Sequence, residues 1–131
     1  MLLGELSAYK VRCIAYDPWG MWDIVPKLSR YERELMAYQQ GIRYMSVPAK
    51  HLESEVRRGA LNFLHNPIMR WMMGNVSIYT DPNGNIKLDK ARSRNKIDGV
   101  VATVDALGGW LTKTTQSKQP YANHSLRTIK L

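Results

Sequence analysis

The sequence lacks the features that define several large protein classes. It has one cysteine, Cys13, so an internal disulfide is excluded, and this thiol lies in an apolar run typical of a core residue in a reducing compartment. No apolar run approaches the roughly 18–20 residues that a membrane-spanning helix needs. The N-terminus has neither the basic region nor the long apolar region of a secretory signal, so no membrane role is predicted.

Several catalytic signatures are missing as well. The three histidines form no HExxH pair, and a single cysteine cannot build a zinc ribbon. No Walker A sequence occurs, and Gly108-Gly109 does not have the pattern of a phosphate-binding loop. No serine lies in a nucleophile elbow. These motif classes are therefore set aside.

The chain does have enough apolar residues for one modest core, and a clear excess of positive charge. Its 131 residues are 44% hydrophobic, which is ordinary for a globular domain. The net charge of +8 favours a polyanionic partner. Residues 112–131 carry basic but no acidic side chains and show little periodicity. They predict a basic, flexible tail after a single domain formed by residues 1–111.

The first half of the sequence predicts two buried strands separated by a helix. Residues 11–16 form an apolar run that stops at a proline, which cannot donate to a strand ladder. Residues 22–40 have the apolar spacing of a helix, and residues 42–47 are a second strand candidate. Asp17 would lie at the carboxyl tip of the first strand, where α/β sheets place ligands. A simple Asp-Pro turn is the alternative.

The second half contains stronger local signals. Residues 50–58 predict a helix, and Asn66 followed by proline predicts the start of another, which runs to residue 72. Residues 76–80 and 85–88 flank Asp-Pro-Asn-Gly, and the Asn-Gly pair supplies the positive φ angles that a hairpin turn needs. A β-hairpin is therefore predicted here.

A basic run follows the hairpin. Of the ten residues 87–96, five are basic and one is acidic. Such a run is usually a solvated surface loop, but here it immediately precedes Asp98, which favours phosphate contacts beside a metal. The candidate DNA-binding residues are Lys87, Lys90, Arg92, Arg94 and Lys96.

A helix beginning near Ile97 has one apolar stripe and one side that carries carboxylates. Gly99 and Ala102 are small, so this second side can press against a sheet and hold Asp98 near a strand end. Asp98 is either a first-turn helix stabiliser or a metal ligand that needs a second carboxylate. The stripe consists of Ile97, Val100, Val101, Val104, Leu107 and Leu111.

Four motifs, in order, resemble one family. They are Tyr-Asp-Pro-Trp at 16–19, Asn-Pro-Ile-Met-Arg-Trp-Met at 66–72, Asp-Pro-Asn-Gly-Asn-Ile-Lys at 81–87 and Lys-Ile-Asp-Gly-Val-Val-Ala at 96–102. The chain resembles, over roughly residues 10–110, the C-terminal nuclease part of the large terminase subunit of tailed bacteriophages with HK97-like heads.

The resemblance implies an α/β chain with a partial RNase H-like nuclease fold that lacks its first strands and carries a β-hairpin insertion. In that family three acidic residues hold two Mg²⁺ or Mn²⁺ ions that cut packaged DNA. Asp17 matches the acid after the fourth strand, and Asp98 matches the acid that starts the last helix. Asp105 stands where relatives usually have an apolar residue. It lies about 10 Å along the helix from Asp98, too far to share one metal, and is not assigned as a ligand.

The family's first catalytic aspartate, first three strands and ATPase domain have no counterpart after Met1. The resemblance therefore implies an N-terminally truncated terminase, for example a prophage remnant, whose nuclease is inactive or incomplete. Two alternatives stay open: a catalytically dead DNA-binding remnant, and a folded fragment with a structural role.

The resemblance also implies partners. These are double-stranded DNA and, in the family, the small terminase subunit and the portal, in the cytoplasm of the bacterial host. Because the strand at residues 11–16 would lack one neighbour, its edge predicts self-association as a dimer. The alternative is that residues 1–10 or the hairpin at 76–88 cover this edge.

Overall fold

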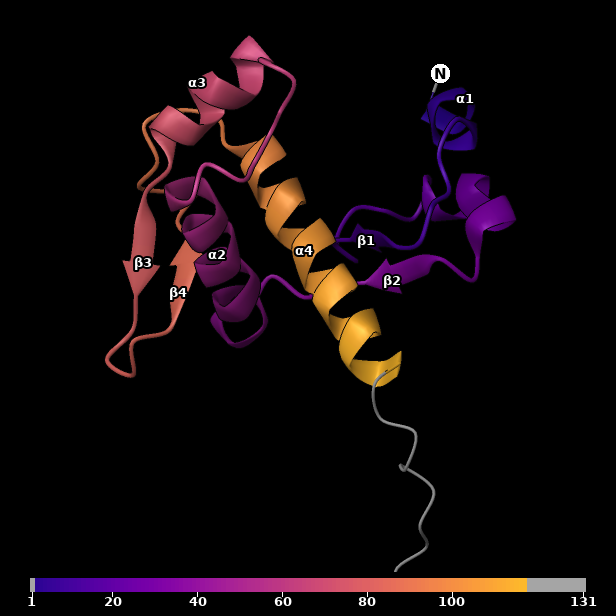
Figure 1. Cartoon of the computed structure of the whole chain (residues 1–131). Helices are drawn as coiled ribbons and strands as arrows, with labels where there is room; N and C mark the ends of the chain where they lie inside the picture. Colours follow the sequence, from indigo (N-terminus) through magenta and orange to yellow (C-terminus); the bar gives the residue numbers. More distant parts are fainter. Residues whose placement is uncertain (1, 118–131) are drawn as a thin grey trace, which may run out of the picture.

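The long helix α4 (Asp98–Ser117) runs through the middle of the molecule, and the other elements lie on two sides of it (Figure 1). The computed structural model describes residues 2–117. Residues 11–40, the β1 side, and residues 42–96, the α2 side, both pack on α4. A short helix, α1 (Leu2–Ser7), precedes the β1 side.

The β1 side holds two short parallel strands, β1 (Ile14–Tyr16) and β2 (Leu35–Ala37), with Ile14 opposite Leu35. The predicted strand at 11–16 is thus confirmed at its carboxyl end. The predicted helix at 22–40 is wrong, because a 3-10 helix, η1 (Val25–Tyr31), and β2 occupy that range. Pairing with β1 overrides the helical spacing, since a neighbouring strand supplies backbone partners that the sequence pattern does not reveal.

The α2 side begins with α2 (Ile42–Arg57), so the predicted strand at 42–47 is wrong and the predicted helix at 50–58 is its second half. Pro48 lies inside α2 and has no N–H to donate to the carbonyl of Tyr44. The hydroxyl of Tyr38 donates to that carbonyl at 2.8 Å instead. Tyr38, the residue after β2, therefore supplies the hydrogen bond that Pro48 cannot make within α2. This long-range contact cannot be predicted from the local sequence.

Helix α3 (Pro67–Asn75) begins where its cap residue predicted. The Oδ1 atom of Asn66 accepts hydrogen bonds from the backbone N–H groups of Ile68 at 2.9 Å and Met69 at 3.2 Å. These bonds satisfy donors that have no partner within the first helical turn.

The predicted hairpin is confirmed as antiparallel strands β3 (Ile78–Thr80) and β4 (Ile86–Leu88). The Oδ1 atom of Asp81 accepts from the backbone N–H of Asn83 at 2.9 Å and of Asn85 at 2.8 Å. The turn is therefore held by its own first side chain, as aspartate turns commonly are. The hairpin forms a separate sheet and pairs with neither β1 nor β2.

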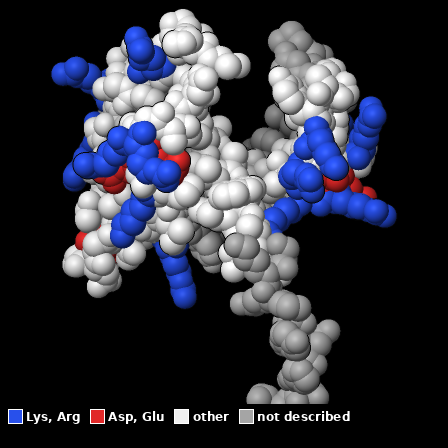
Figure 2. Space-filling view, in the orientation of Figure 1, with Lys and Arg blue, Asp and Glu red and all other residues white. Residues whose placement is uncertain are grey.

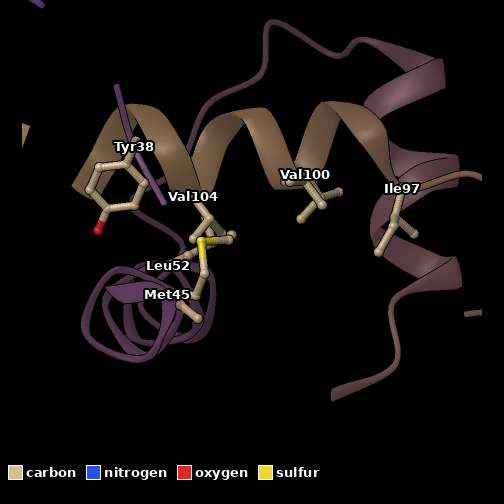
Figure 3. Close-up of a cluster of buried hydrophobic side chains, with 8 residues drawn as sticks. Tyr38, Met45, Leu52, Ile97, Val100 and Val104 are labelled. Atoms are coloured by element: carbon tan, nitrogen blue, oxygen red, sulfur yellow. The ribbon is translucent and has the colours of Figure 1, made fainter. Parts of the chain in front are cut away.

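The core lies where α4 meets α2 (Figure 3). Val104 is fully buried and Val100 is 1% exposed, so the predicted apolar stripe does face the interior. Tyr38 reaches this cluster from the residue after β2. The buried members are Tyr38, Met45, Ala49, Leu52, Ile97, Val100, Val101 and Val104.

Glycines on α4 set how closely its neighbours approach. A Cβ at Gly109 would lie 2.8 Å from the Sγ atom of Cys13, and one at Gly108 would overlap the ring of Tyr38. These two glycines let the β1 side lie on the helix. The prediction that Gly99 faces a sheet is wrong, because its neighbours are the sulfur atoms of Met69 and Met72 on α3. The methionines fill this space because their side chains adapt to irregular gaps.

Helix α4 continues to Ser117, so the expectation of a flexible tail is wrong for residues 112–117, and residues 118–131 lie outside the described part of the chain. No helix in residues 2–117 has the length and apolar character to cross a bilayer. In the same range β1 pairs with β2 alone, and the dimer through residues 11–16 stays a prediction.

Candidate functional site

Asp17 follows directly on β1, at the carboxyl end of the two-stranded sheet. Its side chain is half-buried, and its Oδ1 atom accepts a hydrogen bond from the backbone N–H of Trp19 at 3.0 Å. The carboxylate therefore has the position predicted for a ligand, and it also holds the turn that was the alternative interpretation.

Asp105 is the buried acid of the molecule's centre, with 6% of its surface exposed. The Nε2 atom of Gln40, which follows β2, lies 2.8 Å from both carboxylate oxygens. Burial raises the pKa of Asp105; the Gln40 hydrogen bond opposes that rise, and the negative charge of Asp17 adds to it. The charge of Asp17, at the end of β1, therefore acts on the carboxylate of Asp105 on α4.

The sequence analysis gave Asp105 no role, because it considered only the distance of Asp105 from Asp98 along the helix. A usable signal was present: Asp105 follows Val104 in the most buried part of α4. An acid in such a position needs a partner, because burying a lone carboxylate is costly. Neither Gln40 nor the proximity of Asp17 could be identified without the tertiary structure.

Asp98 lies in the first turn of α4, and its side chain is 63% exposed. The Nζ atom of Lys90 is 3.0 Å from its Oδ1 atom. The hydrogen bond and charge of Lys90 lower the pKa of Asp98, with a smaller contribution from Lys96. Two residues singled out in the sequence are therefore brought together, although as an exposed ion pair they stabilise the fold by at most about 1 kcal/mol.

The basic run is a structured loop attached to the hairpin. The Oδ1 atom of Asp89 accepts from the backbone N–H groups of Ala91 and Arg92, at 3.0 and 3.1 Å. The Oγ atom of Ser77 donates to the carbonyl of Arg92 at 3.0 Å, and the backbone N–H of Arg94 donates to the carbonyl of Asn75 at 3.2 Å. These contacts hold the backbone of the loop in place, and the side chains of Lys90, Arg92, Arg94 and Lys96 are exposed on it.

A cavity of about 300 Å³ is lined by the basic loop and by Gln40, the hydrogen-bond partner of Asp105. Gln40 lines one part of it, and Lys87 and Lys90 line another. The ammonium group of Lys87 also lies 5.9 Å from the centre of the Tyr79 ring. Figure 2 shows Lys and Arg side chains, with acidic side chains among them, over the α2 side of the molecule and a second such group over the β1 side. The cavity, which Asp89 also lines, can therefore receive an anion near Gln40, the hydrogen-bond partner of Asp105.

The donor chemistry of the acids suits a hard divalent cation, because Mg²⁺ and Mn²⁺ prefer carboxylate oxygens. Asp17 and Asp105 carry like charges whose repulsion a cation would relieve. Within residues 2–117 no three His, Cys, Asp or Glu side chains form one group suited to a metal. The carboxylates whose charges interact are therefore Asp17 and Asp105, while Asp98 is paired with Lys90.

Comparison with known proteins gives a consistent picture. Residues 6–114 match the family described as terminase large subunit, endonuclease domain. Protein YmfN of Escherichia coli (strain K12) is 35% identical over 94 residues, which are 70% of this chain and 21% of that protein. The terminase large subunit of Enterobacteria phage HK97 is 26% identical over 97 residues, or 74% of this chain and 19% of that protein.

The crystal structure of the HK97 bacteriophage large terminase is similar to this fold with a TM-score of 0.71 at 25% identity. The similarity covers 82% of this chain and 23% of that one. The chain thus spans about a fifth of the length of the relatives it matches.

Proposed function

Because the chain belongs to the family of terminase large subunit endonuclease domains, we propose that it is the nuclease module of a phage DNA-packaging terminase. The reaction would be hydrolysis of a DNA phosphodiester, and the family is generally dependent on divalent metals. The single observation that supports this best is the buried carboxylate of Asp105, whose hydrogen-bond partner Gln40 lines a cavity together with Lys87 and Lys90.

Asp17 and Asp105 would hold one cation. Asp98 lies about 10 Å along α4 from Asp105 and would serve a second ion instead of sharing that one. A bound Mg²⁺ or Mn²⁺ supplies an activated water and neutralises charge on the phosphodiester. Gln40 keeps the carboxylate of Asp105 oriented through its contact with both oxygens. Lys87 and Lys90 would bind a phosphate in the cavity, and Lys90 would leave Asp98 to do so.

Double-stranded DNA is the proposed substrate, in the cytoplasm of a bacterial host, and a small terminase subunit and a portal are the proposed partners in packaging. The loop would contact phosphates without reading base sequence, so binding should fall steeply with salt, from a Kd of roughly 10⁻⁴–10⁻⁶ M at physiological salt. The contact residues are Lys87, Lys90, Arg92, Arg94 and Lys96.

A second candidate function is DNA binding without cleavage. The observation that favours it is the ion pair between Lys90 and Asp98, which neutralises one of the acids that the family resemblance assigned to catalysis. A protein of this kind would bind duplex DNA through the loop and leave it intact.

Plasmid nicking with Mn²⁺ separates the two functions. We expect slow nicking by the purified chain, lost in Asp17→Asn, Asp105→Asn and Asp98→Asn and retained in Glu53→Gln, whose carboxylate lies on α2. Fluorescence anisotropy on a labelled duplex, from low to high salt, is measured on the same preparations. Duplex binding without nicking at any Mn²⁺ concentration would reject the nuclease and support the second function.

A further inference from the structure

A small apolar cavity lies on the β1 side, lined by the residues on either side of Asp17 in the chain, Tyr16 and Pro18. Its volume is about 250 Å³. Tyr16, the residue before Asp17, contributes to its wall. No charged side chain lines it, in contrast to the cavity at the loop, where lysines and Asp89 take part. The lining residues are Tyr16, Pro18, Met21, Trp22, Val25 and Pro26.

Two tryptophans on this segment are strongly exposed. Trp19 is 88% and Trp22 is 81% exposed. The segment that carries them is held in shape, because the N–H of Trp19 is bound by Asp17 and the N–H of Val25 donates to the carbonyl of Met21 at 3.0 Å. Large aromatic rings presented to solvent from an ordered backbone are typical of surfaces that bind a planar partner.

We propose that this cavity binds an unpaired nucleobase of the DNA strand, which stacks on Trp22 in the cavity wall, with Trp19, next to the lining residue Pro18, as a second platform. The inference rests on the proposed nuclease function, because it takes the cavity's ligand to be the strand that reaches Asp17. Apolar and aromatic walls accept any base face without hydrogen bonds to its edges, so the site selects unpaired DNA and not a sequence.

Charge beside the cavity fits a nucleic acid strand. Lys27 and Arg30 lie on η1, whose first residues Val25 and Pro26 form part of the wall, and both basic side chains are exposed. They can contact the phosphates that flank a bound base. The substrate of the module is then DNA with a melted or single-stranded stretch next to the bond that is cut.

The test is anisotropy with three labelled probes: an oligothymidine, an abasic strand of equal length and a duplex. Because Trp22→Ala removes the stacking of one base on an aromatic ring, it should weaken oligothymidine binding by about 5- to 150-fold. Trp22→Phe should retain much of the affinity. Trp71→Ala, which removes a half-exposed tryptophan on α3, is the matched control and should change nothing.

Binding of the abasic strand should not depend on Trp22. Equal affinity of Trp22→Ala and wild type for oligothymidine would overturn the inference, as would equal wild-type affinity for the abasic strand and oligothymidine. A change in self-association by light scattering, with DNA binding unchanged, would overturn it in favour of a protein contact. If the wild type bound no duplex at low salt, the proposed function would fail as well; duplex binding without an effect of Trp22 rejects the base site alone.

Discussion

The two sides of α4 differ in how well they are buried. On the α2 side, Met45, Ala49 and Leu52 are nearly inaccessible and join the stripe of α4 in one cluster. On the β1 side, residues 11–40 contribute only Leu28 and Tyr38 as fully buried apolar residues, and all of β1 is half-buried. The fold is therefore stabilised mainly on one side, while Asp17 and the base-binding cavity lie on the other, which is consistent with function residing in less stable regions.

The largest effect should come from a matched pair of core truncations. Leu52 is 4% and Leu28 is 3% exposed, but only Leu52 belongs to the main cluster. Leucine-to-alanine changes in cores cost about 2–5 kcal/mol, according to how well the site collapses. Leu52→Ala should fall near the top of that range and Leu28→Ala near the bottom, by urea denaturation. Equal losses would mean that the two sides are equally well packed.

A second change tests the junction of the β1 side with α4. Gly108→Ala places a methyl group into the ring of Tyr38 and should cost about 1–3 kcal/mol. Gly74→Ala is the control, because nothing lies within 4 Å of the added methyl in α3 and the change should stabilise by about 0.5–1 kcal/mol. Thermal melts of both variants measure this, and a Gly108→Ala protein as stable as wild type would contradict the close approach.

The hydroxyl of Tyr38 links the two sides through the carbonyl of Tyr44. Tyr38→Phe should cost about 1 kcal/mol, because that carbonyl loses its donor. In a Pro48→Ala background the helix regains an N–H for the same carbonyl, so the added cost of Tyr38→Phe should shrink. A double-mutant cycle by chemical denaturation measures this coupling, and simple additivity of the two changes would argue against it.

The smallest effects should be those of pH, and their signs differ between the two acids on α4. The pKa of Asp105 is raised, so its ionised form opposes folding at neutral pH, and this cost disappears below the unfolded value of about 3.9. Asp105→Asn should therefore have a higher melting temperature than wild type at pH 7, and the difference in melting temperature should shrink toward pH 4.

Asp98 is the comparison for this test. Its pKa is lowered by Lys90, so it contributes stability above the unfolded value that is lost as the pH falls through the folded one. Asp98→Asn should therefore melt slightly lower than wild type at pH 7 and no differently in acid. The same sign of change in both variants at pH 7 would contradict the environments described for the two carboxylates.

Sequence reasoning succeeded where a feature depends on neighbours in the chain. The cap at Asn66, the turn started by Asp81 and the buried stripe that begins at Ile97 were all predicted and are confirmed. Each depends on contacts within a few residues, or on a periodicity that a long helix must show. The basic loop was located for the same reason, since charge is a property of composition.

Short apolar segments could not be assigned in this way. The same lengths suit a strand or a helix, and residues 22–40 and 42–47 were both assigned to the wrong class. Segment 35–37 is a strand because β1 lies beside it, and Pro48 is accommodated in α2 because Tyr38 replaces the missing donor.

The sequence alone determined that a carboxylate would follow the first strand, at Asp17, and that another would start the last helix, at Asp98. Only the tertiary structure decided that Asp105 is buried, that Gln40, 65 positions away, binds it, and that the charge of Asp17 acts on it. The physical reason is that a buried charge is positioned by whatever surrounds it, and its neighbours here come from a strand end, a loop and a helix that are distant in the chain.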